Sequence, residues 1–84
     1  MKKMEAIILV VSRPGTEEKV YEKLKDHPNV KEIYRVYGEY DLILRVEVND
    51  IEELDKFHDG VLRQTREIEL TETLIASTYG LKED

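Results

Sequence analysis

The hydrophobic positions of the chain fall into four short segments with strand-like patterns. Residues 6–11 form a continuous β-branched run, which is typical of a central strand covered on both faces. Residues 30–37 are rich in Val, Ile and Tyr, and residues 40–48 alternate between apolar and polar side chains. Residues 67–79 have the composition of a last strand. The pattern therefore predicts four strands.

Two segments between these strands carry apolar residues at helical spacing. The first covers residues 16–27, where Thr16 is the candidate N-cap. The second opens with Asp50 and Glu53 at the spacing of a capping box, and Gly60 is its weak point. The predicted apolar faces comprise Val20, Tyr21 and Leu24 in the first helix and Ile51, Leu54, Phe57, Val61 and Leu62 in the second.

The order of these elements predicts an α+β, ferredoxin-like βαββαβ fold. Its sheet would have four antiparallel strands, with both helices on one face. The other face would stay open, although the first strand is apolar on both sides. A bare sheet of this kind is an adhesive patch, so we expect a sheet-to-sheet dimer. A monomer with a mildly apolar open face is the alternative.

Composition and charge narrow the possible functions. The 84 residues predict a single domain over residues 1–84, and the absence of cysteine excludes disulfides and thiolate metal sites. A net charge of −6 disfavours contact with nucleic acid, and 38% charged residues fit the composition of a thermophile protein. No segment resembles a signal peptide or is long enough to span a membrane, so we expect a cytoplasmic protein.

Sequence motifs for catalysis are missing. Neither His27 nor His58 has a second imidazole at metal-ligand spacing. There is no P-loop, no dinucleotide-binding glycine pattern and no aromatic RNA-binding signature. We therefore expect no enzyme activity, no catalytic residue, no metal and no cofactor.

The segment from Gly38 to Asp41, followed by an apolar strand, resembles the Gly-x-x-Asp signature of the Lrp/AsnC ligand-binding domain. This module is also called the RAM (regulation of amino-acid metabolism) domain. Further matching motifs follow in the family's order: Arg13-Pro14-Gly15, Pro28-Asn29-Val30, Asp50-Ile51-Glu52-Glu53-Leu54, and Ile68 followed by Thr71 and Thr73. The helix-turn-helix domain that usually precedes this module has no room before the first strand, so we expect the stand-alone form.

The resemblance implies an amino-acid-binding, oligomer-forming regulatory module of the Lrp/AsnC transcriptional regulators. Such a module modulates amino-acid metabolism without binding DNA itself. The implied partners are a free amino acid, further copies of the chain as a dimer and a ring of four dimers (an octamer), and full-length Lrp/AsnC regulators. The alternatives are a purely structural assembly domain with no ligand and a small ferredoxin-like dimeric enzyme.

Carried over to this chain, the family's pocket involves the turn at residues 38–41 and the last strand. Asp41 would pair with the ligand's ammonium, and backbone amides around Gly38 would bind its carboxylate. We expect a type II′ turn at Gly38, with Asp41 on the strand face opposite Leu42, toward the dimer side or a neighbouring dimer. The candidate ligand-binding residues are Tyr37, Gly38, Glu39, Tyr40, Asp41, Thr71, Thr73 and Ile75.

Each of these candidates also has a structural alternative. Asp41 suits a turn in which its side chain bonds its own backbone, and Gly38 suits a turn that needs a positive φ. The two threonines are good strand formers. Tyr37 stands where the family often has Thr, and Glu67 stands where it usually has Gly. These departures bear on the identity of the ligand more than on the fold.

Overall fold

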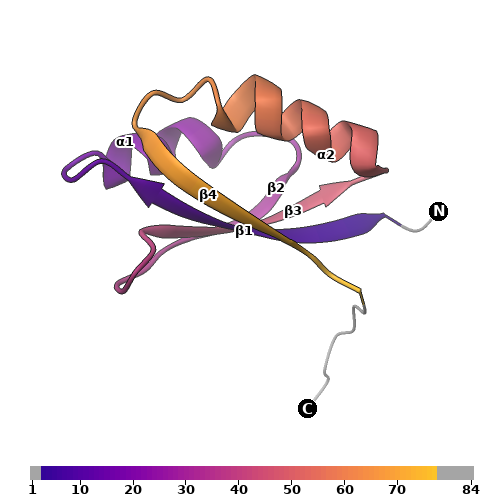
Figure 1. Cartoon of the computed structure of the whole chain (residues 1–84), viewed down its shortest axis with the longest axis horizontal. Coiled ribbons are helices and arrows are strands. Elements are labelled where there is room, and N and C mark those ends of the chain that lie inside the picture. The colour runs from indigo at the N-terminus through magenta and orange to yellow at the C-terminus, as the bar shows by residue number, and fades with distance from the viewer. Residues whose placement is uncertain (1–2, 78–84) are drawn as a thin grey trace, which may run out of the picture.

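The computed structural model describes residues 3–77, which form an α+β fold with one sheet and one layer of helices (Figure 1). The sheet order is β2-β3-β1-β4, and every neighbouring pair is antiparallel. The predicted βαββαβ arrangement is therefore confirmed. The elements in chain order are β1 Met4–Ser12, α1 Glu17–Leu24, β2 Val30–Arg35, β3 Leu42–Val48, α2 Ile51–Phe57, the π-helical segment η1 His58–Leu62, and β4 Ile68–Ile75.

The hydrophobic core lies between the sheet and the helices. Figure 1 shows α1 and α2 on the same side of the sheet, as predicted. Alternate residues of β1 and β3 point into this layer, because successive side chains of a strand face opposite sides. The buried apolar side chains are Ala6, Ile8, Val10, Val20, Leu24, Leu42, Leu44, Val46, Val48, Leu54, Phe57 and Leu62.

The connection between β2 and β3 is longer than the sequence predicted. Residues 36–41 form a loop that is closed by a 3.0 Å hydrogen bond from the Val36 N–H to the Asp41 carbonyl. Gly38 has a φ of +142°, so the expected positive φ is confirmed. The predicted two-residue turn is wrong, because β3 begins at Leu42 and not at residue 40. The predicted end of the last strand at Tyr79 lies outside the described residues.

Thr16 stands at the N-cap of α1 but does not cap it with its side chain. Its hydroxyl donates a 2.7 Å hydrogen bond to the Arg13 carbonyl instead. Glu17 takes part in the same turn by accepting a 3.1 Å hydrogen bond from the Gly15 N–H. The side-chain cap predicted for Thr16 is therefore wrong, because a local bond with the preceding turn competes for the hydroxyl. The helix also ends at Leu24, three residues before the predicted end.

The capping box predicted at the second helix is present in a shifted form. Asp50 Oδ1 accepts a 2.8 Å bond from the Glu53 N–H, as expected. The Glu53 carboxylate accepts a 2.6 Å hydrogen bond from the Asn49 N–H, and this bond holds the pKa of Glu53 below its ordinary value. The α-helix changes to the π-helical segment η1 around Gly60. Ile51 is 50% exposed, so it was wrongly assigned to the buried stripe.

The second face of the sheet is not covered by any described element of the chain. It carries the other set of alternating residues of β1, which pair across with Leu70 and Leu74 of β4. Leu70 is 59% exposed, Leu74 is 48% exposed and Tyr34 of β2 is 52% exposed. We call this surface the open face. Its apolar residues are Ile7, Leu9, Val11, Tyr34, Ile43, Leu70 and Leu74.

Candidate functional site

The loop of residues 36–41 lies at the same end of the sheet as the turn between β1 and α1 (Figure 1). A 2.8 Å bond from the Asp41 N–H to the Val10 carbonyl attaches the loop to the central strand. Ser12 ends that strand and is only 3% exposed. The loop, which carries the candidate ligand-binding residues from Tyr37 to Asp41, is therefore anchored to the sheet.

Asp41 is held by a residue far away in the sequence. Its Oδ2 accepts a 2.8 Å hydrogen bond from the Ser12 N–H and a 3.3 Å bond from the Ser12 hydroxyl. Ser12 follows Val10 in the alternation of β1, so this carboxylate turns toward the helix side of the sheet. The expected place on the strand face opposite Leu42 is wrong, because Asp41 lies before β3 in the loop, and a position toward a neighbouring dimer stays a prediction. Its other oxygen, Oδ1, keeps its acceptor capacity.

An open hollow of about 450 Å³ lies beside Asp41. Its lining comes from the first turn of α1, the end of β2 and the loop: Glu17, Arg35, Val36, Tyr37 and Asp41. We call it the loop hollow. It combines two carboxylates, one guanidinium, an apolar side chain and an aromatic ring. A concave site with a few convergent polar groups is the usual form of a small-molecule site.

Sequence reasoning missed Arg35, although the strand alternation contains a signal for it. Arg35 pairs across the ladder with Leu42, and Ile33 pairs with Leu44. Arg35 therefore belongs to the helix side of the sheet, where the neighbouring positions are apolar. A charged residue at the end of a strand, on the face that packs under the helices, is an exception that pattern analysis can detect.

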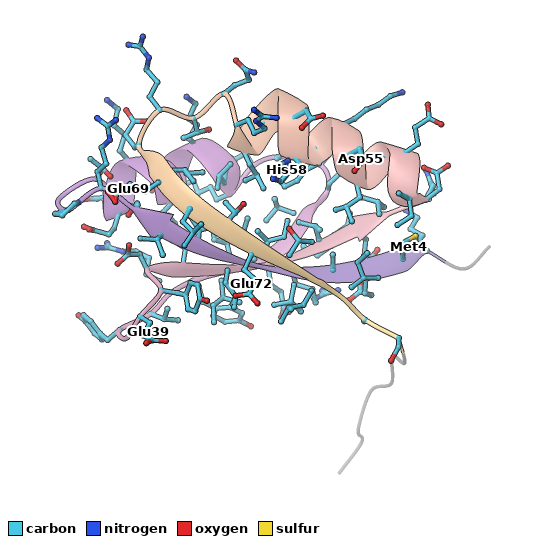
Figure 2. The ribbon with its side chains drawn as sticks, viewed as in Figure 1. Met4, Glu39, Asp55, His58, Glu69 and Glu72 are labelled. Carbon is cyan, nitrogen blue, oxygen red and sulfur yellow. The ribbon has the colours of Figure 1, made fainter. Side chains whose placement is uncertain are left out.

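The other loop candidates point in different directions. Tyr37 is fully exposed at the edge of the loop hollow. Tyr40 leaves the hollow, because its hydroxyl donates a 2.7 Å bond to Glu72 of β4, and this bond raises the pKa of the phenol. Figure 2 shows Glu72 and Glu39 on the side of the sheet away from the helices. Tyr40 thus belongs to the open face rather than to the hollow.

The three candidates on β4 lie apart from the loop within one chain. They pair with buried residues of β1: Thr71 with Val10, Thr73 with Ile8 and Ile75 with Ala6. All three candidates therefore occupy the helix side of an edge strand. Thr71 and Asp41 both flank Val10, on opposite sides of β1. Thr71 lines a second, smaller hollow of about 130 Å³, which we call the edge hollow: its lining is His58, Leu62, Arg63, Ile68, Glu69, Leu70 and Thr71.

The two histidines have structural surroundings. His27 Nδ1 accepts a 3.1 Å bond from the Asn29 N–H, and its ring meets Phe57 edge-on at 4.9 Å. His58 lies 3.3 Å from the Asp59 carboxylate on the surface. Among residues 3–77, no three His, Asp or Glu side chains gather as metal ligands. In the same part of the chain, no helix is long and apolar enough to cross a membrane.

One charged cluster interrupts the open face. Arg45 donates to Glu32 at 2.7 Å, to Glu5 at 2.9 Å and to Glu47 at 3.2 Å. Glu5 is only 7% exposed. The hydrogen bond from Arg45 holds the pKa of Glu32 below its ordinary value, and these contacts raise the pKa of the guanidinium. We call this group the Arg45 cluster. The alternation of residues 40–48 does not predict this cluster.

Comparison with known proteins assigns the chain to a family. Residues 5–78 match the family described as "Lrp/AsnC ligand binding domain". The HTH-type transcriptional regulator FL11 of Pyrococcus horikoshii is 32% identical over 72 residues, which cover 86% of this chain and 47% of that regulator. This chain thus spans about half the length of that curated relative.

Two solved structures match nearly end to end. The structure of FFRP-DM1 is 48% identical, with a TM-score of 0.84, and the match covers 87% of this chain and 97% of that one. The hypothetical protein PHS023 from Pyrococcus horikoshii is 46% identical, also with a TM-score of 0.84, over 90% of this chain and 92% of that one. The sequence and the fold therefore point to the same family.

Proposed function

Because the chain belongs to the Lrp/AsnC ligand-binding domain family, we propose that it binds a free amino acid in the loop hollow. The observation that carries this proposal is the hydrogen bonding and position of the Asp41 side chain. Ser12 fixes one of its carboxylate oxygens, and the side chain lines the hollow beside the Gly38 loop. A carboxylate that is already oriented gives up little freedom when it binds an ammonium group.

The proposed regulatory role follows from the same family membership. The chain would assemble through its open face into dimers, and the dimers into a ring of four, to modulate amino-acid metabolism. It would act through full-length Lrp/AsnC regulators and would not bind DNA itself, in keeping with its net charge of −6. The exposed Leu70 and Leu74 support the dimer, since large apolar patches mark interaction surfaces.

A less similar protein with this fold has been solved with a bound amino acid. The Neisseria meningitidis regulator NMB0573, solved as an L-Met complex, has a TM-score of 0.82 and 17% identity to this chain. At that identity the likeness shows the fold alone, so methionine is known as a ligand of that protein and not of this chain. The ligand of this chain has to come from a screen of its own.

The test is a thermal-shift screen of the twenty common amino acids against the purified protein. An amino acid at 100 times its dissociation constant stabilises a folded protein by about 2.7 kcal/mol. Asp41→Asn removes the charge but keeps an oxygen for the Ser12 N–H, so the fold should persist. We expect it to weaken binding about tenfold to a hundredfold, because a charge-assisted hydrogen bond is worth about 1.5–3 kcal/mol.

Asp55→Asn is the matched control, because Asp55 is an exposed carboxylate on α2 outside the lining of the loop hollow (Figure 2). It should leave binding unchanged. If Asp41→Asn binds as tightly as the unmodified chain, the amino-acid site lies elsewhere. If none of the twenty amino acids shifts the melting temperature, the chain is a structural assembly domain without this ligand.

A further inference from the structure

Among the described residues that line the loop hollow, Arg35 is the only basic one. We infer that Arg35 binds the α-carboxylate of the amino acid whose ammonium pairs with Asp41. The hollow then selects ligands that carry both groups free on one carbon. This inference rests on the proposed function and adds to it the residue that recognises the acid group.

The backbone brings Arg35 and Asp41 to neighbouring positions. Arg35 is the last residue of β2 and pairs with Leu42, the first residue of β3, which directly follows Asp41. The hydrogen bond from the Val36 N–H to the Asp41 carbonyl closes the next rung of the ladder. The two side chains therefore start from adjacent rungs and line the same hollow. Glu17 of α1 adds a second carboxylate there.

These opposite charges do not neutralise one another. Arg35 takes part in none of the ion pairs formed within residues 3–77. Asp41 bonds to Ser12, and Glu17 bonds to the Gly15 N–H. Arg45 differs from Arg35, because it forms ion pairs with three carboxylates on the open face. Arg35 and the anchored Asp41 thus line the same hollow without forming an ion pair with each other.

The ligand that fits this arrangement is a zwitterion with its two charges close together. A guanidinium offers a planar fork of N–H donors that matches a carboxylate, and it stays charged at all physiological pH values. The Asp41 carboxylate accepts from an ammonium. An α-amino acid presents both partners, whereas its α-amide has lost the anionic group. Binding should therefore discriminate between a free amino acid and its amide.

The experiment is isothermal titration of the best-binding of the twenty common amino acids and of its α-amide. The unmodified chain should bind the free acid at least tenfold more tightly than the amide. Arg35→Gln should weaken the free acid tenfold or more and leave acid and amide within about twofold of each other. Arg35→Lys keeps the charge but not the fork, so it should restore part of the preference. Arg63→Gln, at the edge hollow, should change neither affinity.

The outcomes separate this inference from the proposed function. Binding that is lost in Asp41→Asn but keeps its full preference for the acid in Arg35→Gln would overturn the role of Arg35 alone. Binding that is unaffected by Asp41→Asn, or absent in the unmodified chain, would remove both. An Arg63→Gln variant that loses the preference would move the carboxylate site to the edge hollow. Circular dichroism melting of each variant confirms that it is folded.

Discussion

The two faces of the sheet are built from the same kinds of residue but differ in how deeply their side chains are buried. On the helix side, Ile8 and Val10 of β1 are fully buried. On the open face, Ile7 and Leu9 of the same strand are only partly covered, and Leu74 beside them is 48% exposed. The helix side completes the fold within one chain. The open face leaves apolar surface that no described part of the chain covers, so we propose that the first face governs folding and the second assembly.

The charges of the two faces differ as well. The buried set on the helix side contains few polar side chains, and Ser12 there bonds Asp41. The open face has the Arg45 cluster, in which three carboxylates surround one guanidinium. A twofold sheet-to-sheet contact would have to accommodate this excess negative charge from both copies. In such a contact the cluster would make the open face selective about its partner, whereas the packing of the helix side is mainly apolar.

The largest expected effect comes from neighbouring residues that face opposite sides. Leu44→Ala removes a fully buried side chain and should lower the free energy of unfolding by about 2–5 kcal/mol. Ile43→Ala, one residue away on the open face, should lower it by less than half as much. Urea denaturation of both variants at several protein concentrations measures this. Equal losses that do not depend on concentration would erase the distinction between the faces.

Arg45→Met should have the next largest effect. It leaves the buried Glu5 side chain without its ionic partner. Breaking a buried pair on one side costs about 3–5 kcal/mol, and the partial exposure of Arg45 lowers the expected loss to about 2–3 kcal/mol. Arg35→Met, at an arginine outside every ion pair of the described residues, is the control and should change stability little. Urea unfolding at pH 7 tests both; a loss below about 0.5 kcal/mol for Arg45→Met would contradict the cluster's structural role.

Leu74→Glu should weaken self-association at least tenfold, which is about 1.4 kcal/mol. The change adds a charge to an apolar part of the open face. Ile51→Glu is closely matched, because Ile51 is 50% exposed but lies on α2. Sedimentation velocity over a range of concentrations compares the two variants. If Ile51→Glu dissociates the assembly and Leu74→Glu does not, the open face is not the interface.

The smallest expected effect is on pH dependence. The pKa values of Glu32 and Glu47 lie below their ordinary 4.5 in the folded chain. The hydrogen bond from Arg45 is the largest cause for Glu32, whereas for Glu47 a side-chain hydrogen bond with Glu5 comes first and the bond from Arg45 adds to it. The unfolded chain therefore binds more protons near that pH, and stability should fall as the pH drops below about 4.5. Above that value the contribution is fully present. Melting temperatures from pH 7 to pH 3 should show this fall, and Arg45→Met should show a shallower one; parallel curves would contradict the assignment.

Much of the fold could be predicted from local patterns. The alternation in residues 42–48 correctly separated Leu44 from Ile43, because a strand has a strict period of two. The positive φ of Gly38 followed from its residue type and its place in a turn. The capping pair Asp50 and Glu53 followed from its spacing. Each of these depends on residues close together in the sequence.

The site could be predicted only in part, because its decisive contacts are long-range. The partner of Asp41 is Ser12, 29 positions away, and β3 begins two residues later than expected, so Asp41 lies in the loop and not in the strand. The alternation of β2 gave a signal for Arg35, but only the register with β3 places it next to Asp41. The Arg45 cluster likewise combines three strands, since Glu5, Glu32 and Arg45 lie far apart in the sequence.

The most direct test of amino-acid binding is a crystal structure grown with the amino acid that gives the largest thermal shift. We expect its ammonium within hydrogen-bond distance of Asp41 Oδ1, with the bond from the Ser12 N–H to Oδ2 intact, and its carboxylate on Arg35. Electron density for the amino acid in the edge hollow beside His58 and Thr71, with the loop hollow empty, would contradict it.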